Sequence, residues 1–72
     1  MLSTRITIAS PPDRNRLVAE IFFDEEQWAE INQETGILEV EFYPRLNQQP
    51  WRVPLQVAQD ALERASIALM TR

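Results

Sequence analysis

The sequence contains no cysteine and no histidine, and these two absences exclude several kinds of site. Without cysteine there is no disulfide bond, no thiol nucleophile and no thiolate ligand for a metal. Without histidine, the side chain that most often acts as a general base is missing as well. The single glycine, Gly36, cannot build a glycine-rich loop around a phosphate group. We therefore expect a protein that is not an enzyme and has no cofactor and no metal site.

Long apolar runs are also absent from this chain. No stretch approaches the roughly 20 apolar residues that span a bilayer, and the start, Met1 to Ile6, lacks the apolar run of a signal peptide. A length of 72 residues corresponds to one domain, residues 1–72. So short a chain buries only about 60% of its surface on folding, which predicts a net stability of about 3–5 kcal/mol. We expect a cytoplasmic protein that does not contact a membrane.

Positive charge is missing from the middle of the chain. Residues 17–43 hold eight acidic residues and no basic one, and the formal net charge of the whole chain is −4. Such a segment repels phosphate backbones, so we do not expect nucleic-acid binding. It is either a solvated outer face or a surface that attracts a basic partner.

Four segments alternate apolar and polar residues with the period of a β-strand. They cover residues 4–8, 17–23, 27–32 and 37–43. A proline-containing loop over residues 10–16, a polar turn over residues 24–26 and a turn at Gly36 separate them, and the last turn calls for a left-handed residue. Because the connections are short, we expect antiparallel neighbours.

After Pro54, which suits the first turn of a helix, apolar residues recur at helical spacing. This stripe would pack on the apolar face of the sheet, which includes Leu38, Val40 and Phe42, and would bury it. Trp51 is expected to fill the space between the loop and the helix start. The predicted fold is α+β, a four-stranded antiparallel meander covered on one face by a single C-terminal helix (ββββα). The predicted helix stripe is Leu55, Ala58, Leu62, Ala65 and Leu69.

Strand alternation places acidic and aromatic side chains together on the sheet face away from the helix. Aromatic residues on a half-exposed face are favoured at protein interfaces, although cross-strand packing explains them equally well. Arg5 is the only base expected on this face, so most of its charge would lack a partner within the chain. An alternative is a small regulatory domain that binds a ligand or metal ion through the same carboxylates. The candidate protein-binding residues are Glu20, Phe22, Trp28, Glu30, Glu39, Glu41 and Tyr43.

We expect a monomer or a weak homodimer. A two-fold interface through the acidic face would set like charges against each other, which argues against a dimer built there. Ile67 and Met70, on the flank of the predicted helix, are a second candidate contact surface.

The second half of the chain resembles the end of small bacterial proteins of unknown role, some of which are antitoxins or toxin-immunity proteins. The resemblance lies in the strand Glu39-Val40-Glu41-Phe42-Tyr43, in Trp51 and in the helical segment from Ala58 to Ala65. The pattern is similar to antitoxins of the HicB type, in which strands precede an alanine-rich helix, but their glycine-rich segment is missing here. The base-free segment 17–43, with Phe22, Trp28 and Tyr43 on its face, predicts a small acidic protein–protein interaction domain whose partner has a basic surface, and the resemblance makes a toxin a candidate for that partner. The resemblance assigns no functional residue.

Overall fold

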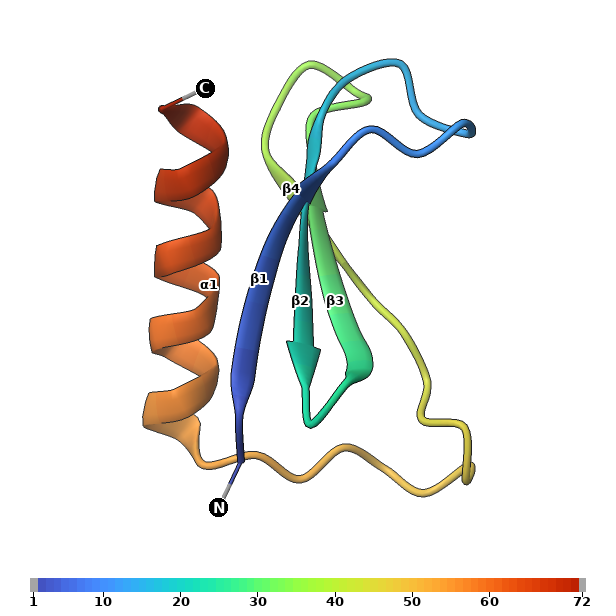
Figure 1. The fold of residues 1–72 in the computed structure, drawn as a ribbon, viewed down its shortest axis with the longest axis vertical. Coiled ribbons are helices and arrows are strands. Elements are labelled where there is room, and N and C mark those ends of the chain that lie inside the picture. The colour runs from blue at the N-terminus through green and yellow to red at the C-terminus, as the bar shows by residue number, and fades with distance from the viewer. Residues whose placement is uncertain (1, 72) are drawn as a thin grey trace.

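The computed structural model describes residues 2–71, which form one antiparallel sheet with one helix packed on it (Figure 1). The elements are β1 (Thr4–Ala9), β2 (Val18–Phe23), β3 (Glu26–Asn32), β4 (Glu39–Phe42) and α1 (Leu55–Met70). The strands lie in the order β1-β2-β3-β4, each antiparallel to the next. The predicted ββββα fold is confirmed. In this part of the chain no helix is both long and apolar enough to cross a membrane.

Both tight turns of the meander use left-handed residues. Asp24 and Glu25 form the two-residue turn between β2 and β3 with φ values of 50° and 68°, which match the twist of a hairpin. The Asp24 carboxylate accepts the backbone N–H of Ser3 at 2.8 Å, which helps to hold this conformation. Before β4, Gly36 has a φ of 94°, as its position in the sequence predicted. Its N–H donates to the carbonyl oxygen of Gln33 at 3.0 Å.

An irregularity in the pairing of β2 with β3 reverses the predicted orientation of Trp28. The register shifts between Ile21 and Phe22, so Trp28 is an extra residue in β3, as in a β-bulge. Its side chain turns toward the helix-covered face, where it is only 7% exposed and its ring lies 4.9 Å from that of Phe23. The prediction that Trp28 points outward was wrong, because strict alternation has no place for an extra residue.

The core lies between α1 and one half of the sheet. The helix packs on β1 and β2 and touches β3, but within residues 2–71 it makes no contact with β4. Trp51 packs against this core, and its Nε1–H donates to the carbonyl oxygen of Tyr43 at 2.8 Å. The buried cluster consists of Ala19, Ile21, Phe23, Trp28, Ala29, Ile31, Ala61, Ala65 and Leu69.

The predicted burial of the apolar face of β4 is wrong. Leu38, Val40 and Phe42 remain 41%, 40% and 57% exposed. Strands lie about 4.8 Å apart, so β4 is roughly 12 Å from the midline between β1 and β2. A helix centred there reaches only about 5–6 Å to either side. One helix is therefore too narrow to cover four strands.

The buried stripe of α1 is rotated relative to the predicted one. Ala61, Ala65 and Leu69 are buried, Leu62 is half-buried, and Leu55 is 72% exposed. Small alanine side chains at the centre of the contact let the helix approach the sheet closely. Leu55 is the first residue of the helix and lies outside its buried stripe.

Candidate protein-binding surfaces

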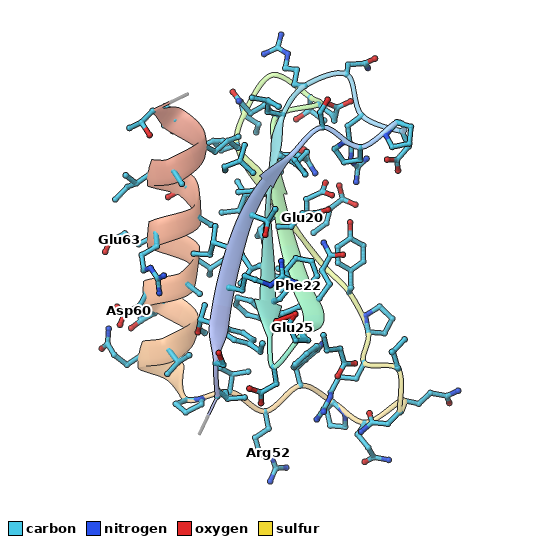
Figure 2. All side chains as sticks on the ribbon, viewed as in Figure 1. Glu20, Phe22, Glu25, Arg52, Asp60 and Glu63 are labelled. Carbon is cyan, nitrogen blue, oxygen red and sulfur yellow. The ribbon has the colours of Figure 1, made fainter. Side chains whose placement is uncertain are left out.

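The face of the sheet away from α1, called here the outer face, carries three glutamates in a row across the strands. Glu20 of β2 lies opposite Glu30 of β3, and Glu30 lies opposite Glu41 of β4. Figure 2 shows Glu20, with Phe22 on the same strand, on the side of the sheet away from the helix. Like charges placed directly opposite each other destabilise a sheet, so this row needs a positive charge.

Arg14, from the loop between β1 and β2, supplies that charge. Its Nε–H donates to Glu30 Oε2 at 2.9 Å, and its Nη2–H donates to Glu41 Oε2 at 2.8 Å. Glu30 is only 4% exposed, and a carboxylate so buried requires both a counter-ion and hydrogen bonds. Arg14 thus bridges two adjacent strands and makes the buried position of Glu30 tolerable.

Two uncharged side chains complete this network. Asn32 is 2% exposed, and its Nδ2 donates to Glu30 Oε2 at 2.9 Å and to Glu41 Oε2 at 2.6 Å. The hydroxyl of Tyr43 donates to Glu30 Oε1 at 3.3 Å. Sequence reasoning missed Arg14 and Asn32, because no local pattern connects a loop arginine or a strand-end amide to carboxylates far along the chain.

The charges of the network shift the pKa of two of its members. Burial alone lowers the pKa of Arg14, but the charges of Glu30 and Glu41 outweigh burial and raise that pKa above its ordinary value. Burial raises the pKa of Tyr43, and the charge of Glu30 raises it further. Arg14 is therefore a permanent cation, and Tyr43 stays an uncharged hydrogen-bond donor at neutral pH.

The acidic charge of the sheet is better compensated within the chain than the sequence predicts. Arg5 binds Glu25 at 3.2 Å, and its guanidinium lies 4.0 Å from the centre of the Phe22 ring. Arg14 binds the glutamate row instead. The expectation that Arg5 is the only base on this face was wrong, because the loop before β2 folds back over the sheet.

The seven candidate residues do not form one surface. Glu39, at the start of β4, is on the same side of the sheet as Glu41, but its carboxylate accepts the hydroxyl of Thr35 at 2.7 Å and is not bound by Arg14. Trp28 lies in the core. The others lie on the outer face, with Glu30 buried and Glu41 about half-exposed: Glu20, Phe22, Glu30, Glu41 and Tyr43.

The glutamate row does not have the geometry of a metal site. Among the residues that the structure describes, no three acidic side chains come together so that they could hold a metal ion. Between Glu30 and Glu41, the position that a cation would take is filled by the guanidinium of Arg14. The geometry therefore does not favour the ligand-binding alternative.

A second surface, which sequence reasoning missed, is an apolar groove of about 440 Å³ between β4 and α1. We call it the β4–α1 groove. It exists because the helix stops short of β4. Its lining combines apolar side chains from β3, β4 and α1 with two glutamates and a serine: Ile31, Leu38, Val40, Leu62, Glu39, Glu63 and Ser66.

Other exposed apolar residues lie near the groove or elsewhere on α1. Phe42 ends β4 and is 57% exposed. Met70 lies one turn after Ser66 and is 64% exposed, whereas Ile67, which is 57% exposed, lies on the side of α1 away from the buried Ala65 and Leu69. Single exposed apolar residues are ordinary, but a contiguous apolar surface beside an unpaired sheet edge is typical of an interaction site.

No family model, no curated protein and no solved structure matches this chain. The outer face and the β4–α1 groove are therefore the features that bear on function.

Proposed function

We propose that this chain is a protein-binding domain and that its partner binds in the β4–α1 groove. The observation that carries the proposal is the exposure of Leu38, Val40 and Phe42, which are 40–57% exposed. They alternate with polar residues as the inward face of a half-buried strand does. Apolar area of this kind gains about 25 cal/mol for each Å² that a partner covers. Because a domain of this size is only marginally stable, burial of these side chains by a partner would also stabilise the fold.

The outer face supports this proposal in a different way. There Arg14 and Asn32 already satisfy Glu30 and Glu41, so a partner on this face would compete with bonds that the chain makes itself. The surplus of negative charge still acts at a distance, because it raises the local concentration of a basic partner and speeds association. In this proposal the negative charge of the outer face attracts the partner from a distance, and the groove makes the binding contact.

An antitoxin or toxin-immunity role, which the sequence resemblance implies, would be one case of such binding. A basic toxin would be steered by the net charge of −4 and held by the apolar groove. This role requires no catalytic or metal-binding residue in the chain.

The proposal is tested by photo-crosslinking in cells that make the protein. Benzoylphenylalanine replaces one residue at a time: Phe42 beside the groove, Phe22 on the outer face, or Gln56 on the exposed side of α1. We expect adducts with another protein from position 42 and few from positions 22 and 56. Adducts from position 22 alone would move the binding site to the outer face. If no position gives adducts while all three variants are folded by circular dichroism, the protein-binding proposal is wrong.

A further inference from the structure

We propose that the segment bound in the β4–α1 groove is an amphipathic helix of a different protein, with an apolar stripe bordered by arginine or lysine residues. This inference rests on the proposed function and names the chemistry of the partner. It follows from the width of the open area, the direction of its apolar side chains and the charges at its rim.

The area that α1 leaves open is about one helix wide. The axes of β1 and β4 lie roughly 14 Å apart, and two helices that pack side by side lie about 8–10 Å apart. A second helix next to α1 would therefore lie over β3 and β4. The open stretch of chain, Leu38 to Phe42, is about 14–17 Å long, which corresponds to roughly three helical turns.

An added β-strand would not cover these side chains. A strand can pair with the open edge of β4, but it would lie in the plane of the sheet. Leu38 and Val40 line the groove with Leu62 of α1, so they point toward the helix side of the sheet. Only an element that lies on that face, beside α1, removes them from water.

Both glutamates that line the groove, Glu39 on the β4 side and Glu63 on the α1 side, hold their carboxylates at its outer margins, and no basic residue lines the groove within the described part of the chain. Glu39 alternates with Val40 and accepts the hydroxyl of Thr35, and Figure 2 shows Glu63 pointing away from the sheet. Long side chains on the two flanks of a bound helix would extend toward these margins. Basic flanks form favourable pairs with the two carboxylates, whereas acidic flanks are repelled.

A second copy of this chain does not have this chemistry. The helix α1 turns Gln56, Asp60 and Glu63 away from the core, and Figure 2 shows Asp60 pointing away from the sheet. Burying these polar groups against Leu38 and Val40 would leave them without partners. Two copies could also pair through their β4 edges about a two-fold axis, with the apolar faces of both sheets on the same side. In that arrangement Glu39 or Glu41 of one copy lies opposite a glutamate of the other copy, and the like charges repel.

The test uses two synthetic helical peptides of about 14 residues with the same leucine stripe at helical spacing. Arginine borders the stripe in one peptide and glutamate in the other. Fluorescence anisotropy of labelled peptides gives their affinities for the full chain. Because several charges change together, we expect the arginine peptide to bind at least tenfold more tightly, with a difference that shrinks as salt is added. Circular dichroism should show a gain of helix on binding.

Matched variants locate the peptide. Val40→Asp should abolish binding of the arginine peptide. Glu63→Gln should weaken it about two- to fivefold, the range of one exposed ion pair. Glu20→Gln is the control, because it removes the same charge from the outer face and should leave the affinity within the error. If Val40→Asp does not fold, amide chemical shifts of the wild-type chain, which should change along β4 and α1, give the same information.

Four results would overturn the inference: equal affinity of the two peptides, equal effects of Glu63→Gln and Glu20→Gln, shift changes on the outer face, or a bound peptide without helix. A stable dimer that Val40→Asp converts to monomer would also overturn it, in favour of a second copy. If photo-crosslinking still places a partner at position 42, the proposed function survives any of these outcomes. If it does not, the function fails independently of the peptides.

Discussion

Arg14 is the residue on which the outer face depends most. It is held by two carboxylates at 2.9 and 2.8 Å, and one of them, Glu30, is almost fully buried. A guanidinium suits this position because its fork of donors reaches two acceptors on neighbouring strands at once. Every basic residue of the chain is an arginine. Arg14 itself therefore stays positively charged at neutral and moderately alkaline pH.

Tyr43 gives this network a measurable pH dependence. Its pKa in the folded chain is raised, first by burial and then by the charge of Glu30. The unfolded value is about 10, so the contribution of Tyr43 to the free energy of unfolding is complete below pH ~10 and is lost as the pH rises through the folded pKa. The chain has no other tyrosine, no lysine and no cysteine that would titrate in this range.

We therefore expect the urea midpoint of the wild-type chain to fall above pH ~10 more steeply than that of Tyr43→Phe. Denaturation followed by circular dichroism at a series of alkaline pH values measures this difference. Parallel curves for the two proteins would mean that the hydroxyl of Tyr43 does not differ in pKa between the folded and unfolded chain.

The position of Trp28 in the core leads to a prediction about the stability of the fold. Its side chain lies in the core beside Phe23, so Trp28→Ala should lower the free energy of unfolding by about 3–5 kcal/mol and leave little folded protein. Phe22→Ala, on the outer face, removes mainly the contact with Arg5 and should lower it by about 1 kcal/mol. Urea denaturation compares the two variants. Similar losses would show that Trp28 is not in the core.

At the scale of elements, the decisive feature is the match between one helix and four strands. The helix buries Ala61, Ala65 and Leu69 on β1 and β2, which leaves β4 as an open edge with an uncovered apolar face. Within residues 2–71, β3 is the only strand or helix that β4 contacts. The β4–α1 groove is thus a consequence of the fold rather than of any single residue.

Substitutions of two leucines of α1 test which side of the helix packs against the sheet. Leu69 is 3% exposed and Leu55 is 72% exposed. Leu69→Ala should lower the free energy of unfolding by about 2–5 kcal/mol, and Leu55→Ala should change it by less than about 0.5 kcal/mol. Both positions lie at ends of the helix, where the change in helix propensity is small, so the difference reports mainly packing. Thermal melting measures it, and equal losses would rule out this orientation of the helix.

For the whole molecule, the distribution of charge decides which ligands are favoured. The chain has a net charge of −4, but the acidic row on the outer face already holds an arginine. Negative charge that is spread over a surface attracts basic partners without forming a cation site. This distinguishes long-range attraction of a protein from coordination of a metal ion.

Millimolar calcium or magnesium should therefore leave the melting temperature of the protein unchanged. The physical reason is that Arg14 fills the space between Glu30 and Glu41 and that no three carboxylates converge within residues 2–71. Differential scanning fluorimetry with and without each ion measures the effect. A clear rise that Glu41→Gln removes would instead favour the ligand-binding alternative.

The sequence by itself determined the elements and their order. Alternation marked four strands, helical spacing marked one helix, and short turns, including one at Gly36, made the strands antiparallel neighbours. These features depend on residues close together in the chain, where side-chain period and turn chemistry act locally. The acidic character of residues 17–43 was equally visible.

Only the tertiary structure decided what those elements present to a partner. The extra residue in β3 sent Trp28 to the core, the loop before β2 brought Arg14 to Glu30 and Glu41, and the width of one helix left Leu38, Val40 and Phe42 open. Each of these outcomes depends on residues distant in sequence that meet only in the folded chain. A pattern read along the chain shows which side of a strand is apolar, but packing alone decides whether another element covers that side.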